Sequence, residues 1–397
     1  MCLSVTSLVG RVSWPRDDAK LDRVRALMSE QDLDALVVRA PDNVLYLSNF
    51  WGMKGYDAAV FPREGEPVLI CLEASRADAE RMAWTSDIRL FPGYDENDPR
   101  PPVLRALDLA RQIASGYDRV GIEASLGTQA ADRMRGEPTT HPKAWFDAFP
   151  DAADATPLLN AARMIKTAQE VERLRVANAI AARAMEHTAS HLHPRMTESE
   201  AAAVWEGWVH AHGTGLHGKV ELAHGYTLVW SGPGIRTFTA TSNRPVRERE
   251  PTLFEIWVVA DGYWADHTKN LVPGELDPRY VELEAQLLDV YRAAIDAARP
   301  GASLAELDRS IREGLAAAGY PGQPSHPVCH GVGARAHEPP YAHRAGGGTI
   351  EEGMVLAIEP GVYWPEGGGL RVEDNFLITA DGAEKLSSFP DGIVRCG

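Results

Sequence analysis

Acidic side chains stand inside some of the most apolar stretches of this 397-residue sequence. Glu255 lies within LFEIWVV and Glu359 within VLAIEPGVYW, while Asp266 and Glu373 occupy similar segments. Burying a carboxylate costs free energy unless the group is paired, hydrogen-bonded or bound to a cation. One such residue is more often a structural hydrogen-bonding group than part of a site. Several together need a compensating cation, either a divalent metal ion or a positively charged substrate.

A histidine belongs to the same constellation. His330 stands in the glycine-rich segment CHGVGARAHEPP, which separates the first two acidic residues from the last two. Four carboxylates and an imidazole are harder to explain as packing than one carboxylate alone. The predicted site therefore contains five residues: Glu255, Asp266, His330, Glu359 and Glu373.

The elements that carry these residues follow from the apolar pattern. In the first part of the chain, strand-like runs alternate with helical periodicity, which is typical of an α/β layer. Later, two rounds of helices followed by strands predict a duplicated α+β unit around a curved sheet. We expect domains over residues 1–160 and 161–397. Helices are expected at 18–31, 103–114, 167–192, 278–298 and after Ser303, and strands at 33–38, 57–73, 119–124, 226–231, 252–268, 354–364 and 370–379.

Local signals mark the ends of some elements. Thr197 followed by Glu200 is the pattern of a capping box, in which two side chains satisfy the first backbone N–H groups of a helix. Pro194 ends the helix before it. The tripeptide Pro41-Asp42-Asn43 predicts a turn.

Composition narrows the class of protein. Hydrophobic residues make up 44% and charged residues 24% of the chain, the balance of a soluble globular protein. The formal net charge of −16 argues against a nucleic-acid binder, because phosphate contacts need a basic surface. We find no apolar run long enough to cross a membrane and no signal-peptide pattern, so we expect a cytoplasmic protein. The four cysteines are scattered, which is typical of a reducing compartment.

The order and spacing of the five residues resemble the pita-bread family of creatinase, aminopeptidase P, prolidase and methionine aminopeptidase. LDALVVRAPDNVLYLSNF resembles the first domain of that family, and ARMIKTAQEVERLRVA resembles its domain junction. The resemblance implies an α+β chain, with a carboxy-terminal pita-bread fold, a smaller amino-terminal α/β creatinase-like domain and a homodimer. In the family's peptidases five ligands hold two metal ions. The matching residues here are Glu255, Asp266, His330, Glu359 and Glu373, and His337 matches the substrate-contacting histidine.

Departures from the family pattern bear on the metal. Glu255 replaces an aspartate, and Trp257 stands where the peptidases usually have a glycine. The segment SGPGIRTFTATSNRP lacks the peptidases' substrate histidine, with Thr239 at about its position. Glutamate is one methylene longer than aspartate, so the carboxylate of Glu255 would shift the geometry by which the two metal ions are bridged, and this geometry tolerates only small changes. These departures favour a site without a metal cofactor.

The leading hypothesis is hydrolysis of a cyclic amidine, because within the family the chain is most similar to ectoine hydrolases. The resemblance implies that ectoine or hydroxyectoine is opened to N-acetyl-2,4-diaminobutyrate, with Glu255 as nucleophile or base and His330 transferring a proton. Asp266, Glu359 and Glu373 would hold the amidinium. Trp257 and Trp264 would form an aromatic wall, and His337 would contact the substrate. Candidate partners for the carboxylate of this small zwitterion are Arg236, Lys269 and Arg371.

Three alternatives remain open. The first is a metal-dependent Xaa-Pro aminopeptidase or dipeptidase, in which the same five residues bind one or two divalent metal ions. The second is a lyase acting on a sulfonium zwitterion. The third is a non-catalytic pita-bread module that binds partners, although such a module has no need of five buried polar residues.

Overall fold

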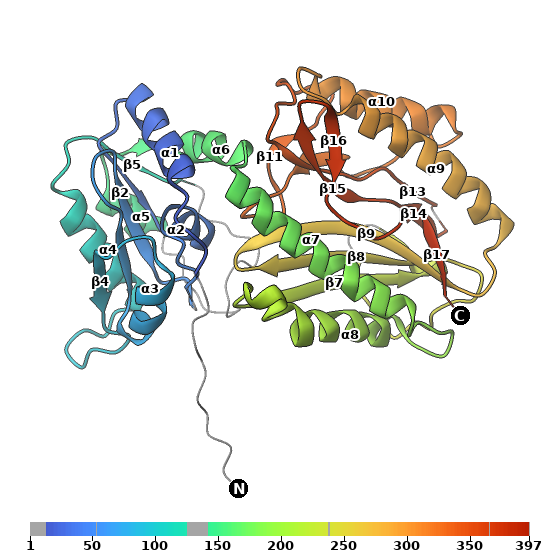
Figure 1. Ribbon diagram of the computed structural model, residues 1–397, viewed down its shortest axis with the longest axis horizontal. Coiled ribbons are helices and arrows are strands. Elements are labelled where there is room, and N and C mark those ends of the chain that lie inside the picture. Colours follow the sequence, from blue (N-terminus) through green and yellow to red (C-terminus); the bar gives the residue numbers. More distant parts are fainter. Residues whose placement is uncertain (1–12, 53, 125–141, 237–238, 365, 397) are drawn as a thin grey trace, which may run out of the picture. The chain divides into compact units, whose positions relative to one another are not determined.

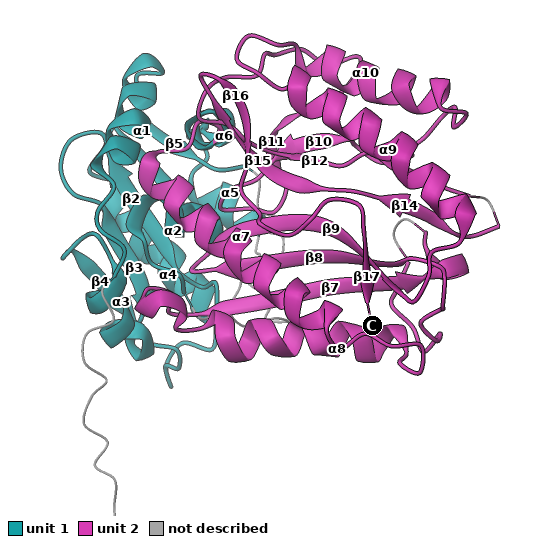
Figure 2. Cartoon of the chain, turned by 45° about the vertical axis from the view of Figure 1, so that its right-hand side comes forward, with its two compact units in different colours: residues 1–163 teal, residues 164–397 magenta. Residues whose placement is uncertain are grey.

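The computed structural model describes residues 13–52, 54–124, 142–236, 239–364 and 366–396. The chain forms two compact units, residues 1–163 and 164–397 (Figure 2). The division falls near the carboxy-terminal end of helix α6 (Thr156–Met164). No helix in the described ranges is both long and apolar enough to span a bilayer. Of the cysteines, Cys71, Cys329 and Cys396 are described, and each is a buried free thiol.

Unit 1 is an α/β layer built on one mixed sheet. Its six strands run in the order β4-β3-β2-β1-β5-β6, with antiparallel pairing of β2 to β1 and β3 and parallel pairing elsewhere. Apolar residues of the strands and of α4 and α5 make its core. The strands are β1 (Ala35–Val38), β2 (Ala58–Pro62), β3 (Val68–Leu72), β4 (Ile88–Phe91), β5 (Val120–Ile122) and β6 (Ala153–Asp154), and the other helices are α1 (Asp18–Glu30), α2 (Pro41–Ser48), η1 (Glu73–Ser75), α3 (Arg76–Met82), α4 (Pro102–Ala114) and α5 (Pro142–Ala148).

The turn predicted at Pro41-Asp42-Asn43 is wrong, because these residues begin helix α2. Proline is well suited to the first helical position, where its missing N–H is not needed. The buried carboxylate of Glu123 accepts hydrogen bonds from the backbone N–H groups of Arg39 and Ala40 and from the Asn43 side chain. A residue far along the chain thus stabilises the start of α2, which a local pattern cannot reveal.

Unit 2 contains two rounds of helices followed by strands (Figure 1). The capping box predicted at Thr197 and Glu200 is confirmed, and Thr167 with Glu170 forms a second one. The first round is α7 (Ala168–Ala189), α8 (Glu198–Trp208), η2 (Val209–Gly213), η3 (Leu216–Gly218), β7 (Ala223–Ser231), η4 (Gly232–Gly234), β8 (Thr252–Ala260) and β9 (Tyr263–Pro273). The second is α9 (Pro278–Ala297), α10 (Leu304–Ala317), β10 (Cys329–Gly331), β11 (Glu338–Tyr341), β12 (Val355–Ile358), β13 (Gly361–Tyr363), β14 (Gly369–Arg371), β15 (Asp374–Thr379), β16 (Gly382–Lys385) and β17 (Ile393–Cys396).

Two sheets of unit 2 meet where β9 lies beside β15. One sheet has the order β17-β9-β8-β7 and the other β11-β10-β12-β15-β16, while β13 and β14 form a separate pair. Helices α7 and α8 pack against the first sheet, and α9 packs against strands of the second (Figure 1). This helix-backed arrangement is the predicted pita-bread fold.

Polar side chains fasten the two sheets together along a seam. The Asn375 side-chain amide accepts a hydrogen bond from the backbone N–H of Asp266 at 3.0 Å and donates one to its carbonyl at 2.8 Å. The Thr268 hydroxyl donates to Glu373 at 2.7 Å, and these two residues also form an isolated β-bridge. The amide therefore takes the place of a strand partner and fixes the backbone that carries Asp266.

Candidate active site

The structure brings all five predicted site residues together in unit 2. Together with His337, their ligand atoms form three overlapping groups, each with all atoms within 4.8 Å of one another. Asp266 and Glu373 join Glu255 in one group, and Glu373 joins His330 and Glu359 in another. Glu255 and Asp266 come from β8 and β9 and His330 from β10, while Glu359 directly follows β12 and Glu373 directly precedes β15.

Strand register explains why Glu255 and Asp266 share one face. In the antiparallel pairing, Glu255 lies opposite Thr268 and Trp257 lies opposite Asp266. Side chains of directly paired residues point to the same face of a sheet, and alternate residues along a strand do so too. These four side chains therefore line one face, while His267 and Lys269 point to the other.

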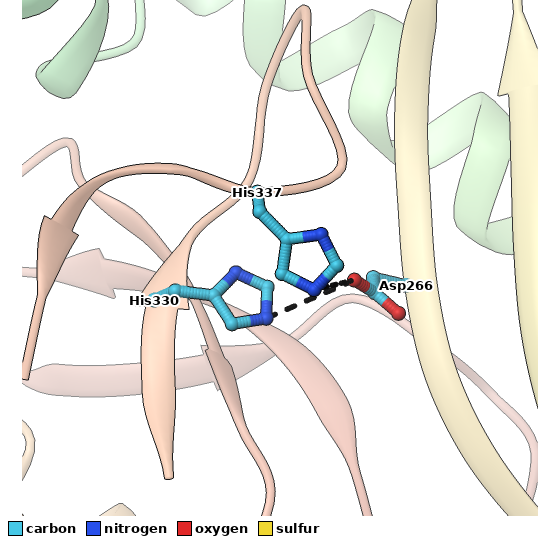
Figure 3. A group of neighbouring side chains, drawn as sticks. All are labelled: Asp266, His330 and His337. Atoms are coloured by element: carbon cyan, nitrogen blue, oxygen red, sulfur yellow. Dashed lines mark ion pairs between the residues drawn. The ribbon is translucent and has the colours of Figure 1, made fainter. Parts of the chain in front are cut away.

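Two histidines approach the Asp266 carboxylate from a neighbouring segment (Figure 3). The Nε2 atoms of His330 and His337 lie 3.8 and 3.6 Å from Oδ2 of Asp266, and the two imidazole rings are 4.2 Å apart. His330 is buried, whereas the side chain of His337 is 35% exposed. His337 therefore stands at the edge of the group, where a substrate can reach it.

The buried carboxylates of the site have too few positive groups near them to balance their negative charge. The pKa of Asp266 is raised by burial and by the charges of Glu373 and Glu359, and burial and Glu373 raise that of Glu359. Burial lowers the pKa of His330, and burial and the neighbouring His330 lower that of His337 to about 3. Both histidines are therefore neutral at pH 7, and the cluster attracts a cation.

The donor atoms fit a divalent metal ion. Within the described part of the chain, both carboxylate oxygens of Asp266 and Nε2 of His330 are buried without a hydrogen-bond partner. The other ring nitrogen of His330 lies 3.0 Å from the Gly331 carbonyl oxygen, which favours a proton there and leaves the Nε2 lone pair directed at the cluster. Carboxylates with one imidazole are the donors that manganese, cobalt and zinc ions accept in proteins.

Glu255 differs from the other four because a buried arginine is bound to it. Arg371 forms an ion pair with Glu255, donates from Nε to the Thr268 hydroxyl at 2.6 Å, and donates from Nη1 to the Tyr363 hydroxyl at 3.2 Å. Burial lowers the pKa of Arg371 to about 10, which leaves it charged at neutral pH. The guanidinium that the sequence assigned to substrate binding is thus held within the protein.

The other two candidate cations for a substrate carboxylate lie elsewhere. Lys269 is buried on the opposite face of β9, where its ammonium group lies 2.6 Å from Asp374. The exposed side chain of Arg236 donates to the backbone carbonyl of Glu366 at 3.4 Å. Neither is directed at the carboxylate cluster by a contact in the structure.

Aromatic residues flank Asp266 on the same face of the sheet. Trp257 is half-buried and lies opposite Asp266 in the register. Trp264 is buried, and its ring stacks with Tyr226 of β7 at a centroid distance of 6.1 Å. The indole N–H of Trp257 is near enough to lower the pKa of Asp266 slightly against the other effects, although it falls short of a hydrogen bond.

Several residues that contact the site were missed at the level of sequence. His326 lies 3.4 Å from Glu359 through Nδ1 and 3.1 Å from the Tyr363 hydroxyl through Nε2. Thr268 and Asn375 hold Glu373 and Asp266 across the seam. None of these three residues stands in an apolar run, so the signal that marked the carboxylates was absent for them.

Family models cover both units of the chain. The model of metallopeptidase family M24 matches residues 172–380, which is more than half of the sequence. The chain belongs to metallopeptidase family M24. The model of the creatinase/prolidase N-terminal domain matches residues 20–165. The predicted membership of the pita-bread family is therefore confirmed.

Relatives and solved structures resemble this M24 protein over nearly its whole length. A putative dipeptidase YkvY of Bacillus subtilis is 28% identical, covering 94% of this chain and 99% of its own. An Xaa-Pro dipeptidase of Lactobacillus delbrueckii is 27% identical, with 91% and 95% covered. The structure of dipeptidase PepE from Mycobacterium ulcerans has a TM-score of 0.76 at 25% identity, covering 96% and 97%. The prolidase of Pyrococcus horikoshii has the same TM-score at 22% identity, covering 94% and 99%, and shows the shared fold.

The similar proteins bear on the choice between the peptidase and the ectoine hydrolase hypotheses. The protein is a member of a hydrolase family, as predicted. The relatives named above are dipeptidases, so they favour the peptidase alternative over an ectoine hydrolase.

Proposed function

We propose that this M24 protein is a metal-dependent dipeptidase that hydrolyses small Xaa-Pro substrates. The observation that carries the proposal is the set of overlapping ligand groups around Asp266, whose carboxylate oxygens lack hydrogen-bond partners among the described residues. The names of relatives that span nearly the whole chain support the same activity.

The roles of the residues follow from their positions. A divalent ion held by Asp266, His330, Glu359 and Glu373 would supply Lewis-acid polarisation of the peptide carbonyl and acidify the attacking water. Glu359 would take a proton from the attacking water as the hydroxyl of this water adds to the carbonyl carbon. The proton then passes to the proline nitrogen as the C–N bond breaks. His337, which is neutral and partly exposed, would hydrogen-bond the substrate.

Metal content and turnover of Ala-Pro test the proposal together. We expect purified protein to contain at least one divalent ion per chain by elemental analysis, and chelation to abolish Ala-Pro hydrolysis. Asp266→Asn should lose both the ion and the activity. Asp289→Asn, an exposed change on α9, is the matched control and should keep both. An active enzyme that stays active after its metal is removed would overturn the proposal.

A second candidate is hydrolysis of the cyclic amidine of ectoine or hydroxyectoine. The observations that favour it are the ion pair of Glu255 with Arg371 and the half-exposed Trp257 beside Asp266. A flat amidinium can stack on an indole, and its charge would compensate the remaining carboxylates without a metal. With ectoine, water adds to the amidine carbon, a ring C–N bond breaks, and N-acetyl-2,4-diaminobutyrate forms.

Incubation with ectoine separates the two candidates. Mass spectrometry should detect a ring-opened product that is heavier by one water if the second candidate is correct. The experiment needs metal-loaded and chelator-treated protein side by side. Ectoine turnover by the metal-free protein, with no Ala-Pro turnover in either form, would replace the dipeptidase proposal by the second candidate.

A further inference from the structure

Strand register places two aromatic side chains in line with Asp266. Tyr226 of β7 lies opposite Trp257 of β8, and Trp257 lies opposite Asp266 of β9. Because directly opposed residues of antiparallel strands point to the same face, these three side chains form one row across the sheet. The row begins at the carboxylate cluster and leads outward across the strands.

The two aromatic side chains of this row are partly accessible, whereas Asp266 is buried. Every residue of β8 and β9 is buried except Trp257, which is half-buried. On β7, Tyr226 is half-buried as well. Burial of a large aromatic side chain stabilises the folded state. A partly exposed tryptophan beside a carboxylate cluster is therefore unexpected for a structural residue.

The row is supported from within the protein. The ring of buried Trp264 lies nearly parallel to that of Tyr226, with an interplanar angle of 23°. A stacked neighbour limits rotation of the tyrosine ring, so the aromatic surface is preorganised before a ligand arrives.

We propose that Trp257 and Tyr226 form an aromatic shelf that binds the ring of a small cyclic substrate and sets the preference for cyclic over open-chain substrates. The proposal rests on the hydrolytic function proposed above. The shared chemistry is a five- or six-membered ring whose nitrogen belongs to the scissile C–N bond, as in both a prolyl residue and ectoine. The ring stacks on the indole, and the scissile bond then lies beside Asp266.

Paired substrates isolate the contribution of the ring. Ala-Pro and alanyl-N-methylalanine are both tertiary amides of the same length, and only the first contains the ring. We expect Trp257→Ala to raise KM for Ala-Pro roughly ten-fold, which is about 1.4 kcal/mol, with kcat changed far less. The KM for alanyl-N-methylalanine should stay within about two-fold of the wild-type KM, because this substrate has no ring to stack on the indole. Trp257→Phe should restore much of the preference, and Tyr226→Ala should weaken it less.

A tryptophan outside the site controls for general effects on folding. Trp208→Ala on α8 should leave the ratio of the two kcat/KM values unchanged, and thermal melting should show that all variants fold. An equal loss for both substrates in Trp257→Ala, or no loss for either, would overturn the shelf.

Equilibrium binding separates failure of the shelf from failure of the proposed function. If the wild-type protein turns over neither Ala-Pro nor ectoine, the proposed function fails, yet the shelf still predicts binding of a ring. Calorimetric titration with L-proline and with ectoine should then show binding of one of them by the wild type and weaker binding by Trp257→Ala. Preference for ectoine would identify the planar amidinium ring as the ligand, and preference for proline the saturated pyrrolidine ring. Equal affinities of the two proteins for both compounds would overturn the proposal.

Discussion

On the back of β9, Asp374 is surrounded by positive groups, whereas on the front its neighbour Glu373 belongs to a cluster of carboxylates. Lys269 and Lys385 place their ammonium groups 2.6 and 3.0 Å from Asp374, and His267 lies 3.1 Å from it. Burial alone would raise the pKa of Asp374, but Lys269 and His267 hold it well below its usual range. On the front, burial and like charges raise the pKa of Asp266.

The difference between the two faces separates structural from functional carboxylates. Both clusters of side chains are buried, and both lie where β9 runs beside the start of β15. The back satisfies its charges with lysines from this chain, whereas the front leaves a charge deficit that only a bound ion or a substrate can fill. Buried carboxylates without counter-ions destabilise the folded state. Their presence is therefore better explained by function than by folding, and it indicates the site.

Substitution of the two neighbours is the strongest test of this contrast. Glu373→Gln should reduce hydrolytic activity by at least about 10³-fold, because metal polarisation contributes several kcal/mol to the rate. It should leave the free energy of unfolding of the metal-free protein unchanged or increased. Steady-state kinetics and urea unfolding check both statements. A variant that is less stable but fully active would show that Glu373 is a structural residue.

The opposite outcome is expected one residue later. Asp374→Ala leaves buried Lys269 without its carboxylate, and breaking a buried ion pair from one side costs about 3–5 kcal/mol. Urea unfolding should show this loss, whereas metal content per folded chain should change little. If stability were unaffected while the metal was lost, Asp374 would belong to the front cluster in function.

The dependence of stability on pH sharpens the comparison further. Asp266 has a raised pKa in the folded protein, so above the ordinary aspartate pKa of about 4 the folded state binds the proton more tightly than the unfolded state does. Its contribution to stability therefore falls as pH rises through this window. Metal-free Asp266→Asn should gain stability over metal-free wild type at pH 8, and the gain should shrink toward pH 5.

Differences between the two proteins remove the contribution of the titrating groups that do not interact with Asp266, because these groups are the same in both. Urea midpoints at pH 5, 6.5 and 8 are sufficient. A gain that grows as the pH falls would contradict the raised pKa of Asp266. Asp374 remains ionised over this range and adds no slope, because its pKa is lowered.

The smallest effect is expected at the rim of the back cluster. The side chain of Lys385 is 25% exposed and also pairs with Asp391. Lys385→Met should cost roughly 1 kcal/mol or less, because a partly exposed ion pair contributes little and Lys269 remains on Asp374. A loss as large as that of Asp374→Ala would mean that Lys385 is the main counter-ion.

Much of this organisation was predictable from sequence, for identifiable reasons. Apolar runs long enough to form strands predicted β8 and β9, and a carboxylate inside such a run marked Glu255 and Asp266. The capping pair Thr197 and Glu200 predicted the start of α8, since both members of the interaction lie within four residues. Sequence patterns thus predicted the helices and strands that are stabilised by contacts between residues close together in the chain.

Contacts between distant segments account for what the sequence did not reveal. Lys269 was a candidate for binding substrate, but register places it on the back of β9 with Asp374. Arg371 was another, and its partner Glu255 lies on a different strand. Helix α2 depends on Glu123, far along the chain. Each outcome is decided by which residues pair across strands, and composition and periodicity carry no information on that.

The seam at Asn375 has a consequence for the order of folding. Its amide holds the backbone of Asp266, and the two residues are separated by 109 positions in the chain. Contacts of such long range form late, because closing the intervening loop costs entropy before the contact repays it. The helices and hairpins of each half therefore gain structure first, and the carboxylates converge only when the halves dock. The capacity to bind a metal ion is thus a reporter of the last step of folding, and metal titration during refolding should lag behind the recovery of helical signal.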